Sequence, residues 1–111
     1  MLDELIGRTA QKVLLHLFHH GETYATAVSK DLATSLGQVQ RQLDHLENVG
    51  LLVSKLSGKT RVYTFNPKSP YSKLFREIVR IDYEGIPLSE REKMFAERRR
   101  PRRRGKPVIK S

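Results

Sequence analysis

The stretch from Val28 to Leu43, VSKDLATSLGQVQRQL, decides the fold. Its apolar residues recur at helical spacing on either side of a break at 33–35, which predicts two short helices joined by a tight turn. Ser35 and, three residues later, Gln38 make a capping-box pattern that marks the start of the second helix. Two such helices, locked together by apolar side chains, form a helix-turn-helix. The side chains expected to form this lock are Val28, Leu32, Leu36, Val39 and Leu43.

Outside this stretch, helical and strand-like patterns follow one another without an internal repeat. Gly21, Gly50 and Pro67 are expected to end the elements that precede them. The expected elements are a helix at about 3–19, a small strand at 22–24, helices at 25–33 and 36–49, strands at 51–56 and 62–65, a helix at 71–83, and a short charged helix that runs from a second capping box at Ser89 and Glu92 to about Arg100.

This order of elements predicts a mostly helical α+β fold, a winged helix-turn-helix. Its core would contain three helices, and the polar, glycine-containing segment 57–61 would join the two strands as a β-hairpin wing. Helix 71–83 would form a C-terminal helical extension. We therefore expect a winged helix-turn-helix domain over 1–84, a linker and short charged helix over 85–100, and a basic arm over 101–111 that is flexible without DNA.

Helix 36–49 has one apolar face and one polar face. The apolar stripe consists of Val39, Leu43, Leu46 and Val49, and the polar face consists of Gln38, Gln40, Arg41, Gln42, Asp44 and His45. Glutamine pairs bidentately with adenine, and arginine pairs with guanine or contacts a phosphate. Gly37 lets the backbone approach DNA closely, and the free amides that follow Ser35 favour a phosphate. These residue types predict a recognition helix for the major groove.

The hairpin loop adds a second DNA-binding element. Lys59, Thr60 and Arg61 follow Gly58, and no acidic residue occurs in 57–61. Cationic and hydroxyl side chains of this kind suit the phosphate backbone, which positions a protein on DNA without reading its sequence. The loop therefore favours DNA binding over a winged helix that contacts only other proteins.

Three segments resemble ArsR-like and MarR-like winged-helix transcription regulators: the helix-turn-helix at 28–43, the passage LENVGLL at 46–52, and the wing KTRVY at 59–63 with Asn66 and Pro67 after it. The resemblance covers roughly residues 5–83. It implies a homodimer that places two recognition helices in successive major grooves. Two departures matter. Ala33 stands where these regulators usually have a turn glycine, and the absence of cysteine excludes metal sensing through thiolates.

Positive charge is concentrated at the C-terminus. The chain of 111 residues has a net charge of +9, and residues 98–111 hold eight of its 21 basic residues and no acidic one. Residues 1–97 therefore carry 13 basic and 12 acidic residues, a net charge of +1. Such an arm indicates a polyanionic partner, and its arginine content favours nucleic acid over an anionic membrane.

The core of the basic arm, 104–107, reads Arg-Gly-Lys-Pro and is preceded by Arg102 and Arg103. It resembles an AT-hook, which lies in the minor groove of A·T-rich DNA. Lys106 replaces the second arginine of that motif, so minor-groove insertion and nonspecific phosphate binding both stay open. The arm residues expected to bind DNA are Arg102, Arg103, Arg104 and Lys106.

Other kinds of site have weaker support. His16, His19 and His20 are spaced i, i+3 and i+4, which could gather metal ligands or simply place histidines at the favourable end of a helix dipole. No carboxylate is obviously beside them, so neither a metal nor another cofactor is expected. The chain has no glycine-rich phosphate loop, nucleophile elbow or HExxH motif, so no enzyme activity is expected.

The sequence thus predicts a DNA-binding transcription regulator whose partner is double-stranded DNA. A homodimer is expected through the first helix and helix 71–83, whose apolar stripe runs from Tyr71 to Val79. The acidic start lacks a secretory signal and no apolar run spans a bilayer, so a cytoplasmic, nucleoid-associated protein is expected. The alternative is a winged-helix adaptor or antitoxin-like partner that binds another protein, with a tail that holds nucleic acid nonspecifically.

Overall fold

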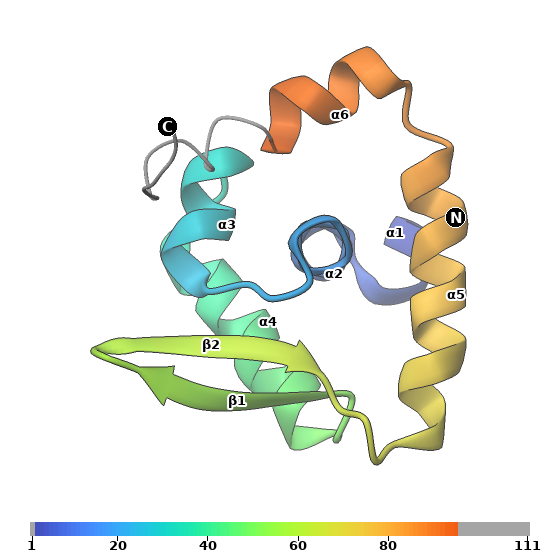
Figure 1. The fold of residues 1–111 in the computed structure, drawn as a ribbon. Helices are drawn as coiled ribbons and strands as arrows, with labels where there is room; N and C mark the ends of the chain where they lie inside the picture. The colour runs from blue at the N-terminus through green and yellow to red at the C-terminus, as the bar shows by residue number, and fades with distance from the viewer. Residues whose placement is uncertain (1, 96–111) are drawn as a thin grey trace, which may run out of the picture.

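The computed structural model describes residues 2–95. In chain order the elements are α1 (Leu2–Ile6), α2 (Arg8–His20), α3 (Ala25–Asp31), α4 (Leu36–Asn48), β1 (Leu52–Ser57), β2 (Thr60–Phe65), α5 (Pro70–Glu84) and α6 (Leu88–Phe95). Helix α2 runs through the centre and is seen end-on in Figure 1. Helices α3 and α4 lie on one side of it and α5 on the other, with the hairpin below and α6 above. Within this part of the chain no helix is long and apolar enough to cross a membrane.

The first predicted helix is divided in two. A single helix over 3–19 is wrong because Gly7 adopts a positive φ of 93°, a non-helical conformation that glycine tolerates and that separates α1 from α2. Gly21 ends α2 as predicted, with a φ of 83° and an N–H that donates to Leu17 O. The short α1 thereby folds back between α2 and α5 instead of extending α2 (Figure 1).

The helix-turn-helix forms where the sequence predicts it, although α3 ends at Asp31, before the predicted residue 33. Ala33 follows with a φ of 50°, and the Thr34 N–H donates to Ser29 O at 3.1 Å. These are the features of a Schellman ending, in which glycine usually takes the left-handed position. The Ser35 hydroxyl then caps α4 by accepting from the Gln38 N–H at 3.4 Å, so the predicted cap is confirmed.

The apolar lock between the two helices is smaller than predicted. Val28, Val39 and Leu43 are fully buried, and Leu32 packs against them from the side. Leu36 is a wrong member of this lock, because its side chain is 48% exposed. Val49, predicted in the apolar stripe of helix 36–49, is wrong there as well, because its side chain is 62% exposed. Leu36 begins α4 and Val49 follows its last residue, so helical spacing continues there past the surface that α2 and α3 cover.

Ala33 gives a prediction for stability. Ala33→Gly should raise the free energy of unfolding by about 1 kcal/mol, because a left-handed conformation is strained for a residue with a Cβ atom. Chemical denaturation measures the change. Ala27→Gly is the matched control, since Ala27 lies inside α3, and it should lower the stability by a similar amount. Equal destabilisation by both changes would contradict the backbone assigned to the turn.

The hairpin is longer than predicted. Strands β1 and β2 pair antiparallel from Leu52↔Phe65 to Ser57↔Thr60, which leaves Gly58 and Lys59 as a two-residue loop. Gly58 has a φ of 64°, as tight hairpin loops require. The predicted small strand at 22–24 is present as a single bridge between Thr23 and Tyr63, which ties the segment before α3 to β2.

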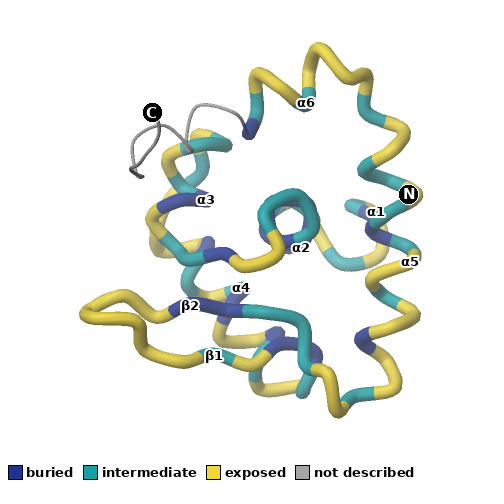
Figure 2. Tube along the Cα trace, in the orientation of Figure 1, coloured by how far each residue is buried: buried dark blue, intermediate teal, exposed yellow. Residues whose placement is uncertain are grey.

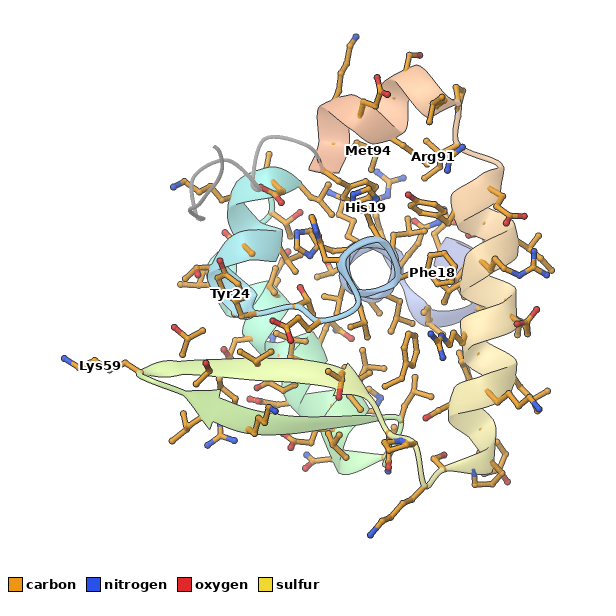
Figure 3. All side chains as sticks on the ribbon, viewed as in Figure 1. Phe18, His19, Tyr24, Lys59, Arg91 and Met94 are labelled. Atoms are coloured by element: carbon orange, nitrogen blue, oxygen red, sulfur yellow. The ribbon has the colours of Figure 1, made fainter. Side chains whose placement is uncertain are left out.

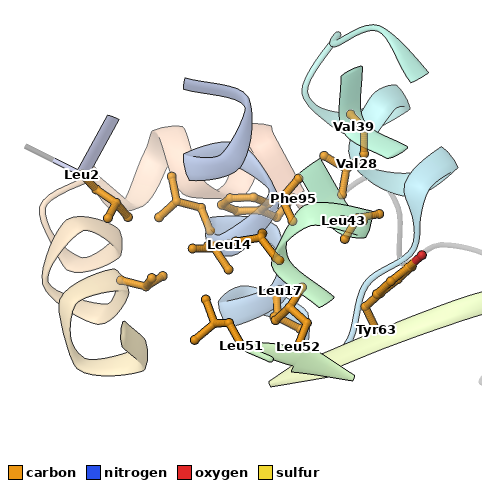
Figure 4. Packing of buried hydrophobic residues seen from close by; sticks show 14 residues of the cluster. Leu2, Leu14, Leu17, Val28, Val39, Leu43, Leu51, Leu52, Tyr63 and Phe95 are labelled. Carbon is orange, nitrogen blue, oxygen red and sulfur yellow. The ribbon is translucent and has the colours of Figure 1, made fainter. Parts of the chain in front are cut away.

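One continuous apolar core surrounds α2. It includes Leu14 and Leu17 of α2, Leu43 of α4, and Tyr63 and Phe95 from the hairpin and α6 (Figure 4). The hairpin loop and most of α6 are exposed, as Figure 2 shows. Phe95 brings the end of α6 back onto the core, so this last described helix packs on the winged domain.

The last two helices start at different kinds of cap. Ser69 caps α5, and its hydroxyl accepts from the Tyr71 N–H at 3.2 Å. The predicted capping box at Ser89 is wrong, because α6 already begins at Leu88 and includes Ser89. The carbonyl of Pro87 accepts the first backbone bonds there, from the N–H groups of Glu90 and Arg91.

Candidate nucleic-acid interface

The outward face of α4 is polar and exposed. Val39, Leu43 and Leu46 are buried, so the opposite side of the helix faces solvent. The exposed residues on and beside that side are Gly37, Gln38, Arg41, Asp44, His45 and Asn48. Asn48 is absent from the predicted set, although its i+7 spacing from Arg41 places it on the same face.

Gln40 is occupied inside the protein. Its side chain is partly buried, and its amide nitrogen donates to the Tyr63 hydroxyl at 3.2 Å and to an Asp44 carboxylate oxygen at 3.0 Å. Tyr63 is 1% exposed and belongs to β2. Gln40 therefore joins α4 to the wing, a role that sequence reasoning missed because it depends on a contact across 23 residues of chain. Gln42 is also partly buried, on the other flank of the exposed face.

The hairpin segment 57–61 has one projecting cation and one tethered cation. Lys59 extends from the hairpin loop into solvent (Figure 3), and Thr60 beside it is exposed. The Arg61 guanidinium instead donates to the Ser54 hydroxyl at 3.0 Å, and Ser54 donates to the Glu47 carboxylate at 2.7 Å. This chain of bonds is a second connection from the wing to α4. Only Lys59 and Thr60 of the three predicted wing residues face solvent without such a tether in the described structure.

The start of α4 is open to a ligand. Gly37 is exposed, and a Cβ atom there would meet nothing closer than Ser35 Oγ at 3.8 Å. The fold itself therefore has no need of glycine at this position. The turn in front is held by Lys12, whose ammonium donates to Thr34 Oγ1 at 3.0 Å. Ser35 and Gly37 are thus presented on a fixed backbone, as a phosphate contact requires.

Helix α5 presents three distinct faces. Ser72 and Val79 face the core and are buried. A second face is charged, where Arg80 binds Glu77 at 2.9 Å and Glu84 at 3.0 Å, and the Glu77 carboxylate together with Glu84 raises the pKa of Arg80. The third face is apolar and consists of Tyr71, Leu74, Ile78 and Ile81 at i, i+3, i+7 and i+10.

Most of that apolar face is uncovered in the single chain. Tyr71, Leu74 and Ile81 are 67%, 62% and 64% exposed. The first predicted helix, by contrast, has its apolar residues in the core, because Val13, Leu14 and Leu17 of α2 are buried. The part of the first predicted helix that keeps an exposed apolar side chain is α1, through Leu5.

Of the three predicted histidines, His19 and His20 lie in the last turn of α2, whereas His16 lies inside the helix. His16 is fully buried, with its Nε2 atom 2.8 Å from Asp31 Oδ2 and its Nδ1 atom 2.8 Å from Thr23 Oγ1. Sequence reasoning found no carboxylate beside the histidines, and the fold supplies one from α3. Threonine, histidine and aspartate in this order resemble a catalytic triad, but Thr23 is 1% exposed, so its hydroxyl has no access to a substrate.

Two solved structures share the arrangement. One is Lactococcus lactis ZitR, a C30AH42A mutant in apo form, with 18% sequence identity and a TM-score of 0.52 over 82% of this chain and 76% of that one. The other is MepR, a transcription regulator of the Staphylococcus aureus multidrug efflux pump MepA, with 17% identity and a TM-score of 0.53 over 86% of this chain and 78% of that one. The fold is a winged helix-turn-helix.

The winged helix is thus confirmed, with α4 as the second helix of the helix-turn-helix and β1–β2 as the wing. No protein-family model matches the chain. No curated protein matches it in sequence either. The basic arm, with Arg102, Arg103, Arg104 and Lys106, lies outside the residues that the structure describes.

Proposed function

We propose that the chain is a DNA-binding transcription regulator that inserts α4 of the winged helix into the major groove. The observation that carries the proposal is the outward face of α4, where Arg41, His45 and Asn48 are exposed on a helix of 13 residues. An α-helix with such a face fits the major groove, and the wing beside it reaches the flanking backbone.

The residues of this interface would have different roles, which follow from their exposure and their contacts within the protein. Gln38, Arg41 and His45 would reach base edges, because they are exposed on the outward side of α4. Ser35 and Gly37 at the helix start, with Lys59 and Thr60 in the wing, would contact phosphates and position the helix. Gln40 and Arg61 would act indirectly, since they hold the wing at a fixed distance from α4. Gln42 would reach DNA from the flank of the helix.

The regulator would act as a homodimer through α5. The apolar face of α5, with Ile78 half-buried and the other three residues exposed, has the 3-4-3 spacing of a coiled-coil seam, which a second copy of α5 would cover. Charged residues stand on a different face of the same helix, where Arg80 is satisfied by Glu77 and Glu84. Leu5 of α1 adds an exposed apolar side chain next to α5. A symmetric dimer would present two copies of α4 to one duplex.

The basic arm would supply electrostatic affinity. A chain that ends at Glu97 loses eight cations, while residues 1–97 keep a net charge of +1. Each phosphate that a cation neutralises contributes about 0.9 to the slope of log affinity against log salt. We expect truncation to flatten that slope by several units and to leave the preference for one sequence over another intact. Fluorescence anisotropy at several salt concentrations measures both.

The result of this truncation tests the proposal. Loss of all sequence preference together with the arm would mean that the winged domain does not read DNA. If the full chain and the truncated chain bind DNA equally well at every salt concentration, the arm has no role in DNA binding. In both titrations, a duplex of scrambled sequence is the reference for nonspecific binding.

A protein-binding adaptor is the second candidate, and exposed apolar residues at the two ends of α4 and in β1 favour it. Leu36, Val49 and Leu56 are 48%, 62% and 62% exposed. Exposed apolar side chains are one means of binding a protein partner. If the chain is such an adaptor, changes at Leu56 would abolish binding of the partner protein, whereas changes at Arg41 would leave the affinity for DNA unchanged.

A further inference from the structure

Two histidines and one aspartate meet near α6, on α2 and α3. His16 and His20 lie one helical turn apart on α2, and their ring centroids are 4.4 Å apart. Asp31, the last residue of α3, brings its carboxylate to 2.8 Å from His16 Nε2. One nitrogen of each imidazole and one Asp31 oxygen all lie within 4.8 Å of one another. The fold thus gathers three donor atoms that the sequence leaves up to 15 residues apart.

We propose that His16, His20 and Asp31 bind a divalent transition-metal ion such as Zn²⁺, against the expectation from the sequence. Imidazole nitrogen and carboxylate oxygen are ordinary zinc ligands, and sites with three protein ligands keep a fourth position for water. In a tetrahedral site with bonds of about 2.1 Å, the donor atoms stand about 3.4 Å apart. Side-chain rotations alone can therefore bring the observed group around an ion.

Thr23 orients the central histidine for this role. Its hydroxyl lies 2.8 Å from His16 Nδ1, and both side chains are buried. A metal-bound histidine usually donates its second N–H to such a partner, which directs the lone pair of the other nitrogen toward the ion. Thr23 is itself fixed, because its backbone exchanges hydrogen bonds of 3.0 and 2.8 Å with Tyr63. The hairpin therefore holds Thr23 in place beside His16.

A metal-free arrangement makes a different demand on His20. In that arrangement the Thr23 hydroxyl donates to Nδ1 of His16, and the Nε2–H group donates to Asp31. These two hydrogen bonds do not involve His20. In the metal site, His20 is a ligand. A change at His20 therefore distinguishes a metal site from the metal-free arrangement.

An ion at this place would link α2 to the end of α3. Asp31 stands immediately before the turn of the helix-turn-helix, so the ion would fix the first helix of that motif against the centre of the core. The result would be a more stable fold in the presence of the metal. The site stands on its own geometry and does not depend on the proposed DNA-binding function.

The test uses the full chain, freed of metal with EDTA and then titrated with Zn²⁺ and Co²⁺. We expect one ion per chain, a higher Tm with Zn²⁺, and the visible absorption of tetrahedral Co²⁺. His20→Ala and Asp31→Asn should weaken Zn²⁺ binding at least about 100-fold, and Thr23→Val about 10- to 100-fold. His45→Ala, which removes an exposed histidine of α4, is the matched control and should bind Zn²⁺ as tightly as the natural chain.

His16 is left unchanged in this series because its fully buried side chain also supports the core. Circular dichroism without metal establishes that each variant is folded. Two results would overturn the proposal: no uptake of Zn²⁺ by the natural chain at a saturating excess of the ion, or binding by His20→Ala that is as tight as that of the natural chain.

Discussion

A chain that carries Leu74→Glu and Ile81→Glu should be monomeric and should bind its DNA site at least about 100-fold more weakly than the natural chain. Both side chains lie on the exposed apolar face of α5 and are more than 60% exposed, so the change leaves the core of one chain intact. In a symmetric dimer the four new carboxylates would face one another across the seam. Monomers would lose the gain in affinity that comes from binding two half-sites of one duplex at the same time.

Lys73→Glu is the matched control for this double change. It also changes the charge by −2, but Lys73 lies on the charged side of α5, away from the seam. We expect it to stay dimeric and to keep most of its DNA affinity. Analytical ultracentrifugation and anisotropy on the same samples measure the two properties. If the double variant stays dimeric, α5 is not the seam, and the dimer must form elsewhere.

The second large effect is expected at Arg41. Arg41→Ala should reduce the affinity for the specific site by roughly 30-fold or more, because one bidentate contact to guanine is worth about 1–3 kcal/mol and a dimer makes it twice. Binding to unrelated DNA should change little, since residues 98–111 carry +8 of the net charge of +9. Competition between specific and scrambled duplexes measures the ratio directly.

Gln40→Ala is the informative neighbour of this change. Gln40 is bonded to Tyr63 and Asp44, so its loss should lower the stability by about 1 kcal/mol and have a smaller effect on DNA affinity than Arg41→Ala. A larger loss of specific binding for Gln40→Ala than for Arg41→Ala would contradict this assignment. It would mean that Gln40 leaves Tyr63 to read a base.

The sequence predicts the elements of this fold well where local signals agree. The cap at Ser35, the glycine at 21 and the hairpin loop at Gly58 each depend on a local backbone preference, and all three lie where expected. The break at Gly7 was missed because an isolated glycine inside a helical pattern is usually tolerated. Here its positive φ lets α1 fold back on the core.

The division of the site into exposed and occupied residues could not be predicted from spacing. Gln40 and Arg61 have the right residue types for DNA contact, but Tyr63 of β2 engages Gln40 and Ser54 of β1 engages Arg61 once the hairpin has formed. The same reason explains Asp31, whose carboxylate reaches His16 only after α3 has packed on α2. Helical periodicity identifies the polar side of α4 and contains no information about which of its side chains the wing will hold.

The central claim is that two copies of α4 read one duplex, and selection of bound DNA from a random-sequence pool tests it most directly. The full chain should enrich an inverted repeat whose half-sites are centred about one helical turn apart, roughly 10 base pairs. The same selection with Arg41→Ala should lose the preference at one position of each half-site. Enrichment of A·T-rich DNA without an inverted repeat, or no enrichment at all, would contradict the account.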